Sequence, residues 1–251
     1  MLDEDKVRER ISLFYAGDDT SWNRGVVSLS ALGAEVAPHI LPLLDDENPF
    51  ARAGAAEVFG RMRHAEAIPL LLKKLGDGDW FVRAKAAAAL GKIGNACAAG
   101  PLKALFMREP HPWARESIAW ALGQICEPGT IPTLCYALGD HYSGVVRTAS
   151  RGLERMVPRN ENDLRLLQNG ISRLSLQKDV GTSRVDLEKC AGELRRTSRA
   201  WAEMLQDAMG ESQEKKGQKR FRGRRGARER SKGRNEILGE IGNARPLRIR
   251  L

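Results

Sequence analysis

The apolar positions between residues 68 and 94 follow the period of an α-helix in two successive segments. One stripe of the second predicted helix carries Val82, Ala86, Ala89, Leu90 and Ile93. Gly94 follows that stripe and is placed to end the helix. The first segment, 68–75, has Pro69 in its first turn, where the missing N–H costs nothing because it would have no partner within the helix. The pattern predicts a pair of helices joined by a short turn.

This pattern recurs along the chain at intervals of 31 or 32 residues. Several columns keep the interval independently, among them a proline, an arginine, an acidic residue and two large apolar residues. The arginine column is Arg52, Arg83, Arg115 and Arg147, and the acidic column is Asp46, Asp77, Glu109 and Asp140. A single helix pair cannot bury its apolar stripe alone, so the units must stack. The sequence therefore predicts an all-α solenoid, with regular units over 36–157 and a degenerate first unit over 1–34.

The repeated segment resembles a known family. Residues 77–94 match the signature of the short, PBS-lyase type of HEAT-like repeat, which ends V-R-x-x-A-A-x-A-L-G-x-I-G. The resemblance extends over about 36–156 and implies an α-α superhelix whose second helices line the concave face. HEAT-like solenoids commonly bind partners there. The resemblance also implies that the acidic and arginine columns form a ladder between adjacent units, which is a structural role rather than a binding site.

Beyond residue 157 the period is lost. Two further helices are expected, over 162–178 and 183–209, because apolar residues keep helical spacing in both segments. We interpret residues 158–210 as helices that cap the C-terminal end of the stack. A coiled-coil arm for dimerisation is the alternative interpretation, although the stripe is too short for sustained heptads. The oligomeric state stays open.

Two columns are candidate partner-binding positions. One lies two residues before the arginines and is aromatic at Trp22, Phe50, Phe81 and Trp113. The other lies near the end of the second helices and includes Arg61, Lys92, Gln124 and Arg155, with Trp120 on the same strip. Exposed rings could grip a peptide or stack on bases, and the strip could contact a protein partner. The alternative is structural: the rings cover the turns, and the cations complement the helix dipoles. Ring exposure separates the two interpretations of the aromatic column.

The net charge of +9 lies entirely beyond residue 210, where fourteen Lys and Arg residues face five Glu. A segment so cationic and so poor in apolar residues is expected to be disordered, and we expect 211–251 to form a disordered basic tail. Nucleic acid is the favoured partner, because phosphate contacts release counterions. Acidic proteins, anionic membranes and a mere solubility role are the alternatives. The candidate residues are Lys215, Lys216, Lys219, Arg220, Phe221, Arg222, Arg224, Arg225, Arg228 and Arg230.

The sequence carries no recognised catalytic motif. It has no H-E-x-x-H, no phosphate-binding G-x-x-x-x-G-K-[ST] loop and no G-x-S-x-G elbow. Some HEAT-repeat enzymes use repeated His-Glu pairs to hold di-iron, and none of the four histidines is followed by Glu. We therefore expect no catalytic residues, no metal and no cofactor. An interaction or scaffold protein is the leading hypothesis, and an accessory subunit or chaperone of an enzyme, such as a bilin-lyase-like HEAT protein, is the alternative.

The cysteines and the hydropathy of the chain indicate where in the cell the protein is expected. The four cysteines form no C-x-x-C pair, and we interpret them as reduced thiols of a cytoplasmic protein. The N-terminus lacks the basic and apolar layout of a secretory signal. No stretch reaches the roughly 18–20 apolar residues of a membrane span, so no integral membrane segment is expected.

Overall fold

The computed structural model describes residues 3–176 and 188–207. The chain divides into two units, Met1–Ala202 and Glu203–Leu251, and the helices below belong to the first unit except for helical residues 203–207. Every regular element in the described residues is a helix, which agrees with the predicted all-α solenoid. Residues 211–251, predicted to be a disordered tail, lie outside the described part of the chain.

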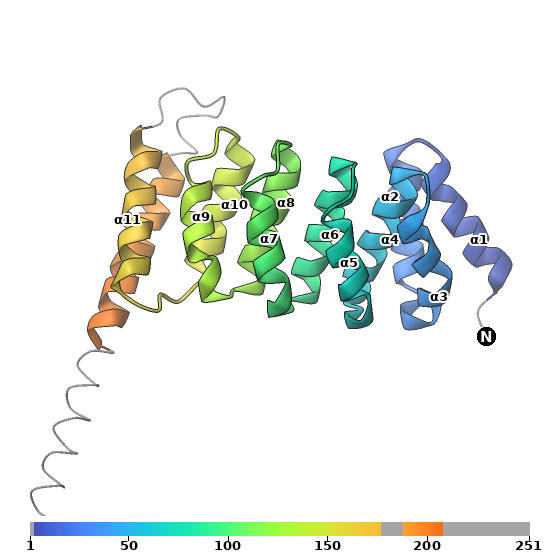
Figure 1. Ribbon diagram of the computed structural model, residues 1–251, viewed down its shortest axis with the longest axis horizontal. Helices are drawn as coiled ribbons and strands as arrows, with labels where there is room; N and C mark the ends of the chain where they lie inside the picture. Colours follow the sequence, from blue (N-terminus) through green and yellow to red (C-terminus); the bar gives the residue numbers. More distant parts are fainter. Residues whose placement is uncertain (1–2, 177–187, 208–251) are drawn as a thin grey trace, which may run out of the picture. The chain divides into compact units, whose positions relative to one another are not determined.

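The helices follow one another in pairs along the chain (Figure 1). The N-terminal pair is α1 (Glu4–Ser12) and α2 (Asp19–Ser30). In the four regular pairs, the first helices are α3 (Ala37–Ile40), α5 (Ile68–Lys74), α7 (Ala99–Phe106) and α9 (Ile131–Ala137). The second helices are α4 (Pro49–Met62), α6 (Trp80–Ile93), α8 (Pro112–Ile125) and α10 (Ser143–Glu154). Short 3-10 turns precede the first helices, and another, Leu41–Asp45, extends α3.

The ends of the second helices are set by local side-chain and backbone chemistry. Asn48 and Asp79 cap α4 and α6 by accepting hydrogen bonds from the backbone N–H groups of Phe50 and Phe81. Gly94 ends α6 in the left-handed region, with φ of 77°, as the sequence predicted. Helices α4 and α8 end on Arg63 and Cys126, which adopt positive φ without being glycine.

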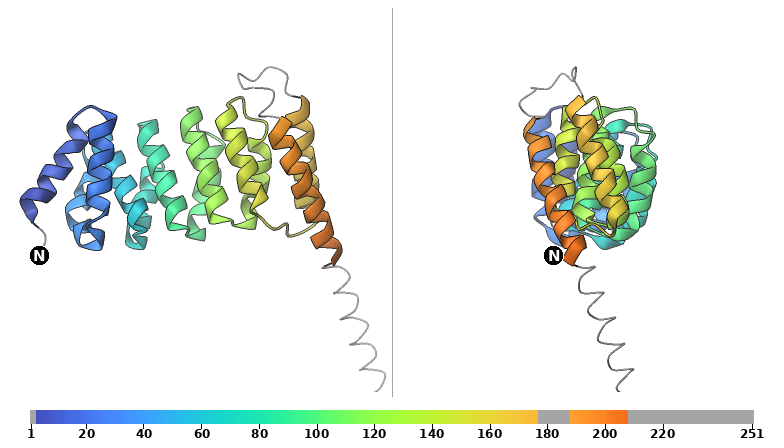
Figure 2. Two further views of the ribbon diagram at one scale, coloured as in Figure 1. Left: turned by 180° about the vertical axis from the view of Figure 1, so that it is seen from behind. Right: turned by 90° about the vertical axis from the view of Figure 1, so that its left-hand side faces the viewer.

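The second helices pack closely on one another, whereas the first helices of neighbouring pairs lie farther apart (Figure 2). The reason is a column of small residues. A Cβ atom added to Gly60 would lie 2.6 Å from the Cα of Ala89, and one added to Gly91 would lie 2.7 Å from the Cα of Ala121. These helices therefore approach backbone to backbone, which is why the repeat has glycine after its large apolar residue and alanine on the facing helix.

The end of the stack beyond α10 is formed by α11 (Glu161–Leu176), which packs on α9, and by a helix over 188–207. Within the first unit, the indole N–H of Trp201 donates a hydrogen bond to the carbonyl of Met156 at 3.0 Å. Trp201 is 1% exposed, so it anchors this helix in the core. Residues 161–176 and 188–202 thus pack on the end of the stack. The predicted start of the last helix, 183–187, lies outside the described residues.

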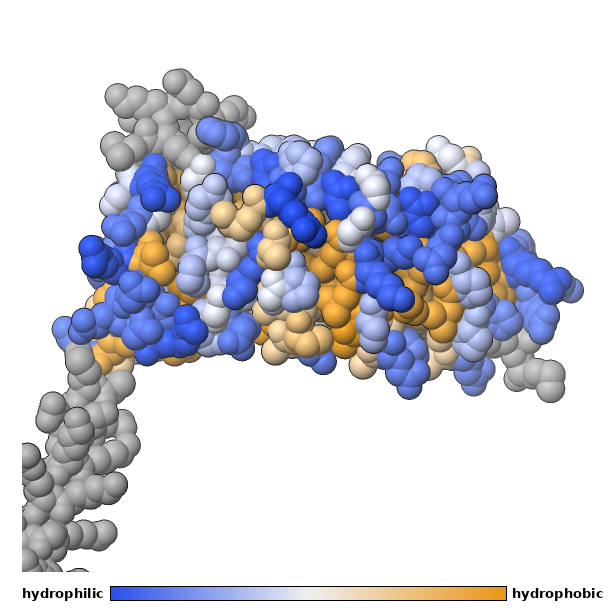
Figure 3. Space-filling view, in the orientation of Figure 1, coloured by the Kyte–Doolittle hydropathy of each residue, from blue (hydrophilic) through white to orange (hydrophobic). Residues whose placement is uncertain are grey.

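Figure 3 shows the side on which the first helices lie. Hydrophobic side chains are visible there between ridges of polar side chains, because the short first helices are spaced apart and leave core residues partly uncovered. In the part of the chain that the structure describes, no single helix is long and apolar enough to cross a membrane. The segments Asp19–Ser30 and Gly33–Asp45 have the length and apolar composition of a membrane span only when they are taken together, and the chain bends by 118° between them.

Candidate functional site

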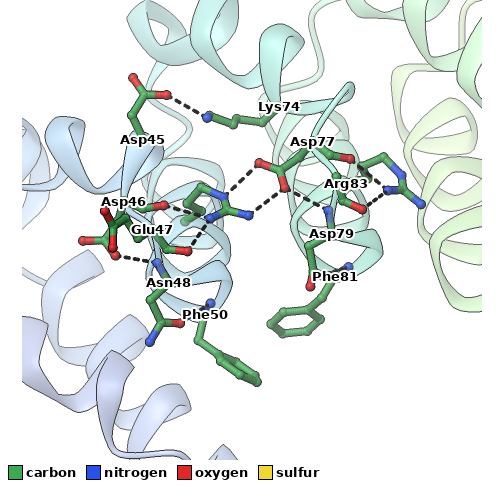
Figure 4. A network of polar contacts seen from close by, with 12 residues as sticks. Asp45, Asp46, Glu47, Asn48, Phe50, Lys74, Asp77, Asp79, Phe81 and Arg83 are labelled. Carbon is green, nitrogen blue, oxygen red and sulfur yellow. Dashed lines mark hydrogen bonds and ion pairs between the residues drawn. The ribbon is translucent and has the colours of Figure 1, made fainter.

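The arginine and acidic columns form a ladder that links neighbouring repeats (Figure 4). The guanidinium of Arg52 donates two hydrogen bonds of 2.9 Å to the carboxylate of Asp77 in the next repeat. The same paired contact joins Arg83 to Glu109 and Arg115 to Asp140, at 2.7 to 3.0 Å. Each arginine also donates to two carbonyls of its own preceding turn. Bidentate geometry makes these strong contacts, and the predicted ladder is present.

Among the described residues, the ladder contacts end at Asp140. Arg147 occupies the same position on α10 as the other ladder arginines. The side chain of Arg147 is exposed and has no ion pair among the described residues. At the other end of the ladder, Asp46 accepts a hydrogen bond of 2.6 Å from the hydroxyl of Tyr15 instead of from an arginine.

Four positions on each second helix form one stripe, because spacings of 4, 3 and 4 residues keep side chains on one side of a helix. We call these stripes together the second-helix face. It consists of Phe50, Gly54, Glu57 and Arg61 on α4; Phe81, Lys85, Ala88 and Lys92 on α6; Trp113, Ser117, Trp120 and Gln124 on α8; and Gly144, Thr148, Arg151 and Arg155 on α10. Both predicted columns, the aromatic one and the one near the helix ends, therefore belong to a single face.

The aromatic column is exposed in part. Phe50 is 48% exposed and Trp113 is 60% exposed, whereas Trp22 is 6% exposed and belongs to the core. Phe81 is half-buried, and its ring centroid lies 5.9 Å from that of Phe50. Figure 4 shows the rings of Phe50 and Phe81 side by side, away from the Lys74–Asp45 ion pair. Trp22 therefore belongs to the core, whereas the rings of Phe50 and Trp113 are open to solvent.

A buried carboxylate lies on the α4 part of the face. Glu57 is 5% exposed and accepts hydrogen bonds from Lys92 of the next repeat and, at 3.1 Å, from Arg61. Burial alone would raise the pKa of Glu57, but the hydrogen bond from Lys92 and the positive charges of Lys85 and Lys92 outweigh it, and the pKa is lowered overall. Two of the predicted partner-binding cations, Arg61 and Lys92, are thus already engaged by one carboxylate.

Lys85 completes this cluster from α6. Its ammonium lies 4.8 Å from the ring centroid of Trp22 and 5.3 Å from that of Phe81, which is cation–π geometry. Burial lowers the pKa of Lys85, with Glu57 acting in the opposite direction. The cluster fixes the relative positions of α2, α4 and α6 and holds the edge of Phe81 in place.

The model of the family of HEAT repeats matches residues 37–116. This part of the chain consists of HEAT repeats. The matched residues run from α3 into the first turn of α8, so they include the ladder contacts Arg52–Asp77 and Arg83–Glu109. No curated protein sequence matches the chain.

Solved structures of helical repeat proteins share the fold of this chain. An engineered protein aligns over 78% of this chain and 97% of its own, with 16% identity and a TM-score of 0.53. A designed armadillo repeat protein in complex with the peptide (KR)4 covers 77% and 99%, with 17% identity and a TM-score of 0.50. The complex of CpcE and CpcF of phycocyanin lyase from Nostoc sp. PCC7120 covers 76% and 75%, with 20% identity and a TM-score of 0.50.

The remaining predicted positions of the second-helix face lie on α8 and α10. Trp120 is half-buried and lies over Gly91, where an added Cβ would come within 3.0 Å of its ring. Gln124 is half-buried beside it on the stripe, and Arg155 is exposed. Arg151, one turn before Arg155, is exposed as well. Neither arginine has a hydrogen-bond or ion-pair partner in the described part of the chain.

Sequence reasoning missed three features of this site. The role of Glu57 as an acceptor for two cations was not predicted, although Glu57 and Lys92 stand on the same stripe of adjacent repeats. The contact of Lys85 with the rings of Trp22 and Phe81 was not predicted either, although Lys85 follows Phe81 by one helical turn. The third feature is a stack of Trp80 on His111, with centroids 3.7 Å apart and an interplanar angle of 15°. Its only sequence signal is that both residues lie in turns one repeat apart.

The structure neither adds a metal site nor reaches the tail. Among the described residues, no group of three His, Cys, Asp or Glu side chains is placed to hold a metal ion. The four cysteines are free, and Cys135 and Cys190 are buried. Burial raises the pKa of the Cys135 thiol to about 12, which makes it a poor nucleophile. The ten predicted nucleic-acid-binding residues from Lys215 to Arg230 lie outside the described residues.

Proposed function

We propose that this HEAT-repeat protein is a non-enzymatic interaction module of the cytoplasm. Its second-helix face would bind a protein partner, and its basic tail would bind nucleic acid or another polyanion. The observation that carries the first half is the exposure of Phe50 and Trp113 at 48% and 60% on a rigid stack of helices. Contact of a large apolar ring with water is unfavourable in the free protein, and burial against a partner removes it. Such rings are typical anchors of protein interfaces.

The rigidity of the surroundings supports a binding role. The ladder and the glycine contacts hold neighbouring second helices in fixed register. Rings presented on such a scaffold lose little conformational entropy when they are covered, because they are already ordered. Phe50 and Trp113, with Phe81 between them, would therefore act as preorganised anchors.

The proposal is tested by affinity capture with the full chain and with a Trp113→Ala variant, after nuclease treatment of both samples. Tyr136→Ala is the matched control, since Tyr136 is 54% exposed but lies on α9, away from the second-helix face. We expect Trp113→Ala to reduce capture of protein partners by about tenfold or more, as loss of an interface hot spot does. Equal capture by the two variants would refute a role for the face.

The accessory-subunit alternative has a narrower basis. The fold likeness to a phycocyanin lyase complex is compatible with a bilin-lyase-like role, but the likeness is one of fold. No residue of the second-helix face is placed as a nucleophile or an acid–base pair in the described part of the chain. Transfer of a bilin chromophore to an acceptor protein in the presence of this chain, and not in its absence, would favour the alternative.

A further inference from the structure

The second-helix face is divided into two chemically different halves. Its exposed or half-buried rings lie on α4, α6 and α8, at Phe50, Phe81, Trp113 and Trp120. Its cations without an ion-pair partner among the described residues lie on α10. The division bears on the partner, because an occupant that follows the face would meet aromatic rings on the first three helices and positive charge on the fourth.

The cations of the aromatic half are already engaged. Arg61 and Lys92 both donate to Glu57, and Lys85 lies against the rings of Trp22 and Phe81. A phosphate or carboxylate on this half would have to compete with the buried carboxylate of Glu57 for these groups. Apolar and aromatic side chains can instead cover Phe50 and Trp113 without disturbing the Glu57 cluster.

The arginines of α10 are in the opposite situation. Arg147, Arg151 and Arg155 are exposed at spacings of four residues, so they lie along one side of the helix. Arg147 has no ion pair among the described residues. Like charges spaced in this way repel one another, and an anionic ligand would relieve that repulsion.

The acidic groups near α10 do not neutralise its arginines. Glu116 of α8 accepts a hydrogen bond from the hydroxyl of Thr148. Glu154 accepts one from Ser150, at 3.3 Å, on the side that meets the next helix. There desolvation and the negative charge of Glu193 raise the pKa of Glu154, with Arg151 and Arg196 acting in the opposite direction. The exposed side of α10 therefore remains cationic.

We propose that the second-helix face binds an extended protein segment that is apolar or aromatic where it crosses α4 to α8 and acidic where it crosses α10. The proposal rests on the proposed function, of which it specifies the partner. Neighbouring packed helices are about 8–10 Å apart, and an extended chain advances about 3.3 Å per residue. Each repeat therefore corresponds to about three residues of the segment, and the four helices to about ten to twelve.

Two other occupants fit the face less well. A nucleic acid carries its negative charge evenly along the strand, and the aromatic half, as far as the structure describes it, offers no disengaged cation to pair with phosphates. The chain's own tail carries the same sign of charge as α10, with eleven Lys and Arg against one Glu over 215–234, so the arginines would repel it. An occupant that changes from apolar to acidic along its length matches both halves.

The test uses the full chain and a fluorescent peptide of about twelve residues, with Leu and Phe at every third position of one half and four Glu in the other. A second peptide has Gln in place of Glu, and a third ligand is a single-stranded oligouridylate. The protein variants are Arg151→Glu/Arg155→Glu and a control, Arg108→Glu/Arg165→Glu. The control residues are also exposed and have no ion pair among the described residues, but they lie off the second-helix face. The tail is identical in all variants, so its contribution cancels.

We expect Arg151→Glu/Arg155→Glu to weaken binding of the Glu peptide by about tenfold or more, because a favourable charge pair becomes a repulsive one. The control variant should change the affinity by less than about twofold, and the Gln peptide should not distinguish the two variants. Circular dichroism verifies that both variants fold. If the Glu variant does not fold, Arg151→Gln/Arg155→Gln replaces it, with a smaller loss in the same direction.

The outcomes separate this inference from the proposed function. If Trp113→Ala weakens binding of the Glu peptide but the α10 variant does not, the face binds protein segments and the acidic specificity is wrong. If the α10 variant weakens binding of oligouridylate and leaves the peptide unchanged, the occupant is a nucleic acid and the inference is overturned. If neither Trp113→Ala nor the α10 variant affects the peptide, both proposals fail.

Discussion

At the scale of single residues, each ladder arginine makes two kinds of contact. Arg83 donates a fork of two hydrogen bonds to Glu109 in the next repeat, and it also donates to the carbonyls of Asp77 and Gly78 in its own turn. A lysine could not reproduce this, because an ammonium lacks the planar fork. One side chain thus closes the turn within its repeat and fixes the spacing to the next.

Replacing Arg83 by Ala should lower the free energy of unfolding by about 3 kcal/mol at neutral pH, since it leaves the buried carboxylate of Glu109 without its partner. Arg147→Ala is the matched control, because Arg147 holds the same position but is exposed and has no ion pair among the described residues, and it should cost less than about 0.5 kcal/mol. Urea denaturation measures both. Similar losses in the two variants would contradict a stabilising role for the ladder.

The difference between wild type and Arg83→Ala should also depend on pH. Burial alone would raise the pKa of Glu109, but the hydrogen bond from Arg83 and that from the backbone of His111 lower it overall, below the ordinary 4.5. A lowered pKa stabilises the fold at pH values above the ordinary pKa, and this contribution is lost as the pH falls through the lowered value. The destabilisation should therefore shrink as the pH is taken below 4.5.

At the scale of helices, the repeat depends on glycine at positions where two backbones meet. Gly91 of α6 lies against Ala121 of α8, and Gly123 of α8 lies against Gly152 of α10. Glycine is unfavourable within a helix by about 1 kcal/mol relative to alanine. Its presence here is therefore explained by packing between helices and not by helix formation.

Gly91→Ala should reverse the usual effect of replacing a helical glycine. The added Cβ would lie 2.7 Å from the Cα of Ala121, a backbone atom that cannot move aside alone. We expect a loss of about 1–3 kcal/mol from overpacking. Gly100→Ala on α7 meets nothing within 4 Å and serves as the control. It should leave the melting temperature unchanged or raise it, and thermal unfolding compares the two. A stabilised Gly91→Ala variant would show that the helices are not in backbone contact.

At the scale of the whole molecule, charge and hydrophobicity are segregated along the chain. Residues 1–210 carry equal numbers of basic and acidic residues, and the net charge of +9 belongs to residues 211–251. A balanced folded part and a cationic segment suit two different kinds of ligand. This sequence feature supports the proposal that the tail binds a polyanion independently of the second-helix face.

Replacing the candidate tail cations and Phe221 by Gln should weaken binding of single-stranded RNA most strongly at low salt. The logarithm of the affinity should also fall less steeply with the logarithm of the salt concentration, by about 0.7 for each phosphate that the tail no longer neutralises. Fluorescence anisotropy at about 50 and 200 mM salt measures both quantities. A full chain with Arg108 and Arg165 replaced by Gln is the control. Unchanged affinity and slope in the tail variant would contradict RNA binding by the tail.

The fold could be predicted from the sequence because it repeats. Proline, arginine, acidic and large apolar columns in phase over four units fix the helix pairs, their turns and the stacking. A local rule repeated at 31 or 32 residues needs contacts only between neighbours, so sequence spacing is enough to place them. The aromatic column and the column of Arg61, Lys92, Gln124 and Arg155 were visible for the same reason.

Only the tertiary structure decided which members of these columns are available to a partner. Trp22 and Phe50 occupy the same column, yet Trp22 is 6% exposed and Phe50 is 48% exposed, because the rings of Phe14 and Phe81 pack against Trp22. Arg61 and Arg155 also share a column, but Glu57 engages Arg61 and nothing in the described residues engages Arg155. The physical reason is that the repeat period determines the direction in which a side chain points from its helix. The exposure of that side chain and its ion-pair partner depend instead on the residues that the adjacent repeat places beside it.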